Sequence, residues 1–136
     1  MVDKKSLSER DICTKFITPA IKKSGWDIQK QVLEEVYFTD GRIHVRGNLA
    51  TRTKGKRADY ILYDHSNVPV AIIEAKDNKH SVRAGIQQAL DYAEILDIPC
   101  VFSSNGDGFI FHDKTNKEGK IEQELSLDGF PSPEVL

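Results

Sequence analysis

The chain has 136 residues, 29% of them charged and 39% hydrophobic, and its formal net charge is −2. This length supports one domain with its own core and leaves no room for a motor domain or a second catalytic unit; the P-loop pattern of nucleotide-binding proteins is also absent from the sequence. The near-neutral charge gives no global basic field, so any contact with nucleic acid has to be local.

Cysteine usage and hydropathy indicate a cytoplasmic protein. Cys13 and Cys100 are the two cysteines of the chain, and their apolar or small neighbours predict buried, reduced thiols. No stretch approaches the ~18 apolar residues of a membrane span, so we expect neither secretion nor membrane insertion.

The first half of the chain predicts a helix followed by antiparallel strands. Residues 8–24 carry apolar side chains at spacings of three and four, which is typical of an amphipathic helix, and Gly25 ends it. Residues 26–46 have apolar side chains on both sides of Thr39-Asp40-Gly41, which indicates a hairpin. The strand-like runs 58–63 and 70–75 predict a second hairpin.

The second half predicts a crossover connection. Residues 81–96 have helical periodicity, with Ser81 available as a cap, and they are followed by strands at 100–103 and 109–112. The strand at 70–75, this helix and the strand at 100–103 form a unit that is expected to be parallel and right-handed. The predicted fold class is α/β, a mixed central β-sheet flanked by helices.

The domain is predicted to extend over residues 1–128. The segment 129–136, with two prolines, is expected to be the start of a linker.

Two acids and a lysine lie at predicted strand ends. Glu74-Ala75-Lys76 closes an apolar run, and Asp59 lies in the preceding strand. Because side chains alternate along a strand, Glu74 and Lys76 share one face, and a single neighbouring strand brings Asp59 beside them. A second Glu-x-Lys triplet, at 118–120, lies in a loop-like stretch, so the inference depends on placement rather than on the triplet.

These residue types fit metal-dependent phosphodiester hydrolysis. Carboxylate oxygens suit Mg²⁺, which takes one or two carboxylates and keeps several waters; Mn²⁺ can substitute. Asp59 and Glu74 are the expected ligands, with the carbonyl of Ala75 as a third. Lys76 would orient water and stabilise developing charge; alternatively, it is an ordinary strand-end lysine that offsets Glu74.

The second predicted helix adds Gln88 and Tyr92, which share one face because they are four residues apart. We expect both to point toward the acids and to hydrogen-bond a phosphate or the lysine. The alternative is a tyrosine that completes the core and a solvated glutamine.

The ordered set of Asp59, Glu74-Ala75-Lys76 and Gln88-x-x-x-Tyr92 resembles the PD-(D/E)xK nuclease superfamily, in its branch with a Q-x-x-x-Y helix. The first motif here is Ala58-Asp59, without the proline. More closely, the chain is similar to the N-terminal nuclease domain of the R subunit of type I restriction-modification enzymes. The matching stretches are 8–10, 24–26, 56–63, 73–76, 88–93, 104–107 and 130–134.

This resemblance implies a restriction-endonuclease-like sheet and an enzyme that cuts both strands of double-stranded DNA remote from its recognition site. The partners implied are the modification and specificity subunits, and ATP would act only through motor domains that this chain lacks. The chain is therefore expected to be a fragment of a larger subunit. The resemblance also makes Glu9 an additional active-site acid, whereas Ser6-Leu7-Ser8-Glu9 also fits a helix capping box.

Four basic residues are the predicted DNA contacts: Lys56, Arg57, Lys79 and Arg83. Lys79 and Arg83 rank first because a helix N-terminus favours anions and the second helix is expected to begin there. Arg52 and Lys54 are interpreted as a solvated loop. The four histidines have no ligand spacing, so no zinc site is expected.

Three other hypotheses remain open at this stage. The chain could be a non-catalytic DNA-binding or docking module of the same fold. It could be an unrelated α/β domain, in which case Asp59 and Glu74 would lie far apart. It could also be a nuclease of the same superfamily from another restriction or repair system.

Overall fold

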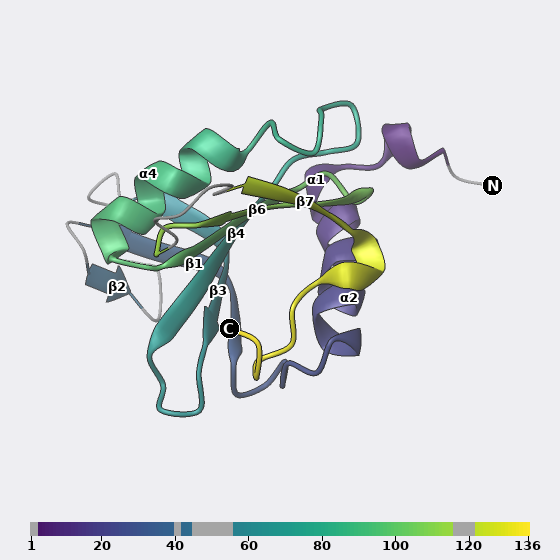
Figure 1. The fold of residues 1–136 in the computed structure, drawn as a ribbon. Helices are drawn as coiled ribbons and strands as arrows, with labels where there is room; N and C mark the ends of the chain where they lie inside the picture. The colour runs from purple at the N-terminus through teal and green to yellow at the C-terminus, as the bar shows by residue number, and fades with distance from the viewer. Residues whose placement is uncertain (1–2, 40–41, 45–55, 116–121) are drawn as a thin grey trace.

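The computed structural model describes residues 3–39, 42–44, 56–115 and 122–136. Within these ranges, a seven-stranded mixed sheet with the order β2-β1-β3-β4-β5-β6-β7 carries helices on both faces (Figure 1). The α/β class predicted from the sequence is confirmed. The strands are β1 (Val32–Thr39), β2 (Arg42–His44), β3 (Lys56–Tyr63), β4 (Pro69–Ala75), β5 (Cys100–Ser104), β6 (Gly108–Asp113) and β7 (Glu122–Ser126).

The strand pairing follows the two predicted hairpins and the crossover. β1 pairs antiparallel with both β2 and β3, and β3 pairs antiparallel with β4. β4 and β5 are parallel, as a crossover requires, and β6 returns antiparallel to β5. β7, which the sequence analysis did not predict, adds antiparallel to β6. Asp40 and Gly41, at the expected first turn, lie outside the described residues.

One continuous helical segment covers one face of the sheet. It consists of α1 (Glu9–Ile12), the π-helical η2 (Cys13–Ile17) and α2 (Thr18–Lys23), and it is preceded by the short η1 (Lys4–Ser6). The Ser8 side chain caps α1, since its Oγ accepts the N–H of Asp11 at 3.1 Å. The apolar stripe of the helical segment 9–23 packs against side chains of β3, β4 and β5, as the helical periodicity predicted.

The opposite face of the sheet carries α4 (Ile86–Leu96) (Figure 1). This helix begins at Ile86 and not at Ser81, so the sequence prediction was wrong there. The Oγ of Ser103 donates to the Val82 carbonyl at 2.7 Å, and the Ile86 N–H donates to the Arg83 carbonyl at 2.9 Å. These bonds use backbone groups in turns rather than in a helix, and Gly85 occupies the N-cap without a side-chain cap.

The end of the chain packs on the domain. Phe130, which follows η3 (Leu127–Gly129), is 4% exposed in the core beneath α1 and α2. The indole N–H of Trp26 donates to the Pro131 carbonyl at 2.8 Å. Phe130 therefore belongs to the packed domain, and the start of a linker within 129–136 stays a prediction.

In the part of the chain that the structure describes, no helix is long and apolar enough to cross a membrane.

Candidate active site

Asp59 and Glu74 meet where β3 and β4 stop pairing with each other. Glu74 lies at the end of β4 as predicted, whereas Asp59 lies inside β3, which begins at Lys56 and continues its pairing with β1. The ladder between these strands ends at Tyr60 opposite Ile73. One step further, side chains take over the backbone bonds: the Asp59 N–H donates to Glu74 Oε1 at 3.4 Å, and the Ala75 N–H donates to Asp59 Oδ2 at 2.8 Å. These two hydrogen bonds hold Asp59 and Glu74 together just beyond the last backbone pair of β3 and β4. The hypothesis of an unrelated domain with distant acids is wrong.

Both acids are buried, and Glu74 is buried more deeply. The side chain of Asp59 is 8% exposed, and residue Glu74 is 3% exposed. Burial raises the pKa of Glu74 to about 10, and the hydrogen bond and charge of Asp59 act in the same direction. Without a cation, burial and the neighbouring Asp59 therefore favour the protonated form of Glu74.

The donor set fits a hard divalent cation. In the described ranges, 3–39, 42–44, 56–115 and 122–136, no group of three or more His, Cys, Asp or Glu side chains is arranged to hold a metal ion. Mg²⁺ needs one or two carboxylates and retains its waters. Asp59 and Glu74 supply such a pair, and a cation between them would offset the charge that burial disfavours.

Glu9 lies beside this pair. Its pKa is raised by burial and by the charge and hydrogen bond of Asp59, whereas the charges of Lys76 and Arg57 lower it. Glu9 is the first residue of α1, and the cap is Ser8 bonded to Asp11, so the predicted capping box does not form. The structure thus brings Glu9 from the first helix to the acids of β3 and β4.

Ala75 points into the core, as the strand alternation predicts, and Lys76 follows it. Ala75 is buried in the core on the α1–α2 side of the sheet. Lys76 directly follows β4, and its N–H donates to the Ser104 carbonyl at 2.9 Å. The half-buried side chain of Lys76 is close enough to Glu9 to lower the pKa of that carboxyl.

The structure pairs Gln88 with Tyr92 on α4. Gln88 Nε2 donates to Tyr92 Oη at 2.8 Å, and the Tyr92 ring lies edge-on to Phe38 with centroids 5.0 Å apart. Burial raises the pKa of Tyr92, and the charges of Glu74 and Asp59 also raise it. Tyr92 therefore packs in the core close enough to the acids for their charge to act on it, and Gln88 is its hydrogen-bond partner.

The four predicted DNA contacts have different surroundings. Lys79 and Arg83 lie in the turns before α4, so the helix N-terminus that was their rationale is absent from that position. Arg83 also forms an ion pair with Glu122 on β7. Lys56 is exposed at the start of β3, and Arg57 Nη2 donates to Asp59 Oδ1 at 3.3 Å. Arg52 and Lys54 lie outside the described residues.

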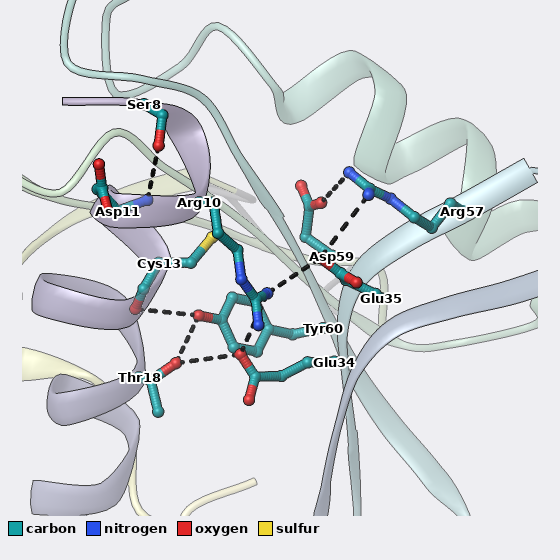
Figure 2. Close-up of polar contacts among 10 residues, drawn as sticks. All are labelled: Ser8, Arg10, Asp11, Cys13, Thr18, Glu34, Glu35, Arg57, Asp59 and Tyr60. Atoms are coloured by element: carbon teal, nitrogen blue, oxygen red, sulfur yellow. Dashed lines mark hydrogen bonds and ion pairs between the residues drawn. The ribbon is translucent and has the colours of Figure 1, made fainter.

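A pocket of about 270 Å³ opens onto Asp59 from the side of α1. Arg10 and Glu35 lie at this pocket, and Figure 2 shows both near Arg57 and Asp59. The sequence analysis predicted no role for either residue: Arg10 lies in the stretch 8–10 that resembles the family but was not interpreted, and Glu35 lies in a strand-like run without a motif. The lining residues are Ser8, Glu9, Arg10, Cys13, Glu35, Arg57 and Asp59.

Comparison with known proteins decides the family. A family model described as the type I restriction enzyme R protein N terminus matches residues 27–130. The chain belongs to this family. The resemblance of the chain to the N-terminal domain of type I restriction R subunits is thereby confirmed.

Individual relatives agree with the family. The chain is 49% identical over 132 residues to the type I restriction enzyme EcoAI endonuclease subunit of Escherichia coli. This alignment covers 96% of the chain and 16% of the relative. It is similar in structure to a fragment described as an HsdR subunit of a type I restriction enzyme from Vibrio vulnificus, with a TM-score of 0.71, 36% identity, and coverage of 94% of this chain and 24% of that one.

A more distant structure shares the fold. The DrdV–DNA complex matches 89% of this chain and 10% of the other, with a TM-score of 0.53 and 15% identity. The chain spans 16% of the length of the curated relative that it matches.

Proposed function

We propose that this chain is the Mg²⁺-dependent nuclease domain of a type I restriction enzyme R subunit and that it hydrolyses phosphodiester bonds in both strands of DNA. The observation that carries the proposal is that the Asp59 N–H donates to Glu74 Oε1 while the Ala75 N–H donates to Asp59 Oδ2, so the two acids lie together where the pairing of β3 with β4 ends. Family membership and a relative named as an endonuclease subunit support it.

In this proposal, Asp59 and Glu74 hold Mg²⁺ or Mn²⁺ through their carboxylates, with the carbonyl of Ala75 as a third oxygen. When bound, the cation would supply charge stabilisation at the scissile phosphate and the leaving oxygen. Lys76 orients the attacking water and stabilises developing negative charge. Glu9, beside Asp59, supports the metal site.

Gln88 and Tyr92 act as a hydrogen-bonded pair that positions a phosphate or the Lys76 ammonium. Recognition of the DNA sequence and ATP-driven translocation belong, in this proposal, to modification and specificity subunits and to motor domains outside this chain. The net charge of −2 is consistent with a domain that contacts the DNA backbone while its partners supply most of the affinity.

The first test is isothermal titration of Mg²⁺ and Mn²⁺ into the wild type, Asp59→Asn and Glu74→Gln, paired with a plasmid nicking assay. We expect metal affinity to fall at least about tenfold in both variants, because each removes a ligand of one shared site. Glu94→Gln, an exposed acid on α4 paired with Lys114, is the control for charge.

Circular dichroism confirms that the variants remain folded. Wild-type metal binding that both folded variants retain would overturn the site and leave a non-catalytic docking module as the better account.

The role of Lys76 separates chemistry from metal binding. Lys76→Met is expected to retain Mg²⁺ affinity and to lower nicking by roughly a hundredfold or more, since removal of a group acting on the transition state reduces rate rather than ligand binding. Equal losses of metal affinity and nicking would instead indicate that Lys76 only supports the fold of the site.

A further inference from the structure

Two arginines from distant parts of the chain meet one carboxylate at the mouth of the pocket beside Asp59 (Figure 2). Arg10 Nη1, from α1, donates to Glu35 Oε1 at 3.0 Å. Arg57 Nη1, from β3, lies 3.9 Å from the same oxygen. All three side chains are 42–58% exposed, so solvent reaches the cluster. Glu35 therefore shares one oxygen between two guanidinium groups.

Glu35 has an unusual backbone. Its φ is +52°, inside β1 and between the paired residues Glu34 and Val36. Side-chain-bearing residues rarely adopt this conformation, and such outliers concentrate at functional sites. Its carboxylate lies within 4.0 Å of both arginines in spite of this cost, whereas Glu34, the other acid of the strand, lies at 4.0 Å from Arg10.

The cluster is continuous with the proposed catalytic acids. Arg57 also donates, through Nη2, to Asp59 Oδ1 at 3.3 Å, so a ligand on Arg57 would lie next to that carboxylate. Partial burial opposes the charge of Arg57, but Asp59 and Glu35 outweigh it and raise its pKa. Arg10 also lies 4.0 Å from Glu34 Oε1, so carboxylates offset the charge of both arginines in the protein without DNA.

Guanidinium groups bind phosphates as well as carboxylates, because both can accept two parallel N–H···O bonds. A phosphodiester offers two non-bridging oxygens, one for each arginine, where Glu35 offers a single shared one. A DNA phosphate therefore satisfies Arg10 and Arg57 more completely than Glu35 does.

We propose that Arg10 and Arg57 form a binding site for a phosphate of the DNA backbone and that Glu35 occupies this site until DNA displaces it. The inference rests on the proposed function for the nature of the ligand and deepens it by naming the contact and its competitor. The two arginines then bind the DNA phosphate, and Glu35 lowers the affinity for DNA because it competes for them.

The test is an NMR titration of a short DNA duplex into the protein in EDTA, with the arginine Nε–Hε signals as the readout. Glu35→Gln removes the competing charge, so we expect DNA to bind about two- to fivefold more tightly than to the wild type. Glu94→Gln makes the same change of net charge on α4, and its affinity is expected to stay at the wild-type value.

The arginines give the opposite result. Arg10→Gln and Arg57→Gln are expected to weaken binding, and each is expected to lower the slope of log affinity against log salt by about one. In the wild type, the duplex should shift the signals of both arginines.

The proposal is overturned if Glu35→Gln binds DNA no more tightly than Glu94→Gln, since Glu35 would then support the arginines rather than compete for them. It is also overturned if the duplex shifts neither arginine signal. These readouts need no metal, so a failure of the nuclease proposal, seen as unchanged metal binding in the ligand variants, is distinguishable from a failure here.

Discussion

Glu74 is the residue in which burial and charge have the largest consequence. It accepts a hydrogen bond from the Asp59 N–H, and it is 3% exposed. Burial and the neighbouring Asp59 raise its pKa to about 10. A carboxyl held in this way is poorly suited to the metal-free protein and well suited to a cation, because a cation stabilises the charged form that burial disfavours.

This predicts an unusual dependence of stability on pH. Between the ordinary pKa of 4.5 and the folded value of about 10, the folded protein binds more protons at Glu74 than the unfolded chain does. The free energy of unfolding in EDTA should therefore fall as pH rises through this range. Glu74→Gln removes the titration, so its melting temperature should exceed that of the wild type by a margin that grows with pH.

Thermal melts of both proteins at about pH 5 and about pH 9 in EDTA measure this margin. Parallel changes of the two melting temperatures would show that Glu74 titrates near its ordinary value. Added Mg²⁺ should reverse the order at high pH, since ligand binding to the folded state stabilises it.

The turn segment 77–85 between β4 and α4 packs beside the candidate active site. Two buried amides tie it to the β5–β6 turn: Asn78 Nδ2 donates to the Asn105 carbonyl at 2.9 Å, and Asn105 Nδ2 donates to the His80 carbonyl at 2.7 Å. Gly85 lies against Glu74, where a Cβ would be 3.3 Å from the Glu74 carbonyl oxygen. This segment therefore fixes the position of α4 relative to Glu74 and Lys76.

Asn105→Ala should loosen this segment. The substitution removes a donor to His80 and an acceptor of the Asp107 N–H, so the expected loss of stability is about 1–3 kcal/mol. Hydrogen exchange should rise in 77–85 more than in the strands. Gln29→Ala, at an exposed amide, is the control and should change neither quantity. Unchanged exchange in 77–85 would show that other contacts hold the segment.

For the whole molecule, the two faces of the sheet carry separate apolar clusters, one under α1 and α2 and one under α4. The chain end belongs to the first cluster, because the Phe130 ring lies 4.7 Å from Phe102 and 4.8 Å from Phe109 between ring centroids. The tail therefore stabilises the face that carries Glu9 and Arg10.

Phe130→Ala should destabilise the domain by about 3–5 kcal/mol, since it leaves a cavity among aromatic rings. Chemical denaturation measures this loss, and Val135→Ala, at a side chain that is 73% exposed, should change stability by less than about 0.5 kcal/mol. A loss at Phe130 no larger than at Val135 would place the edge of the folded unit before residue 130.

Local patterns in the sequence predicted most of the fold. Helical periodicity located the segment that the structure places at 9–23, and apolar runs bounded by turn residues located β3, β4, β5 and β6. These predictions succeed because periodicity reports which side chains face the core, and that is a property of neighbouring residues. β7 has no such pattern, since it is a polar edge strand that pairs through its backbone.

The sequence by itself determined the motifs that resemble the family, because Asp59, Glu74 and Lys76 are recognised from their residue types and spacing along two apolar runs. Only the tertiary structure decided that Glu9 and Arg10 come from the first helix to these acids, that α4 starts at Ile86, and that Arg83 is paired with Glu122. Each of these depends on which distant element lies alongside, and on burial and charge that arise only when both elements are packed. No local pattern encodes such pairs.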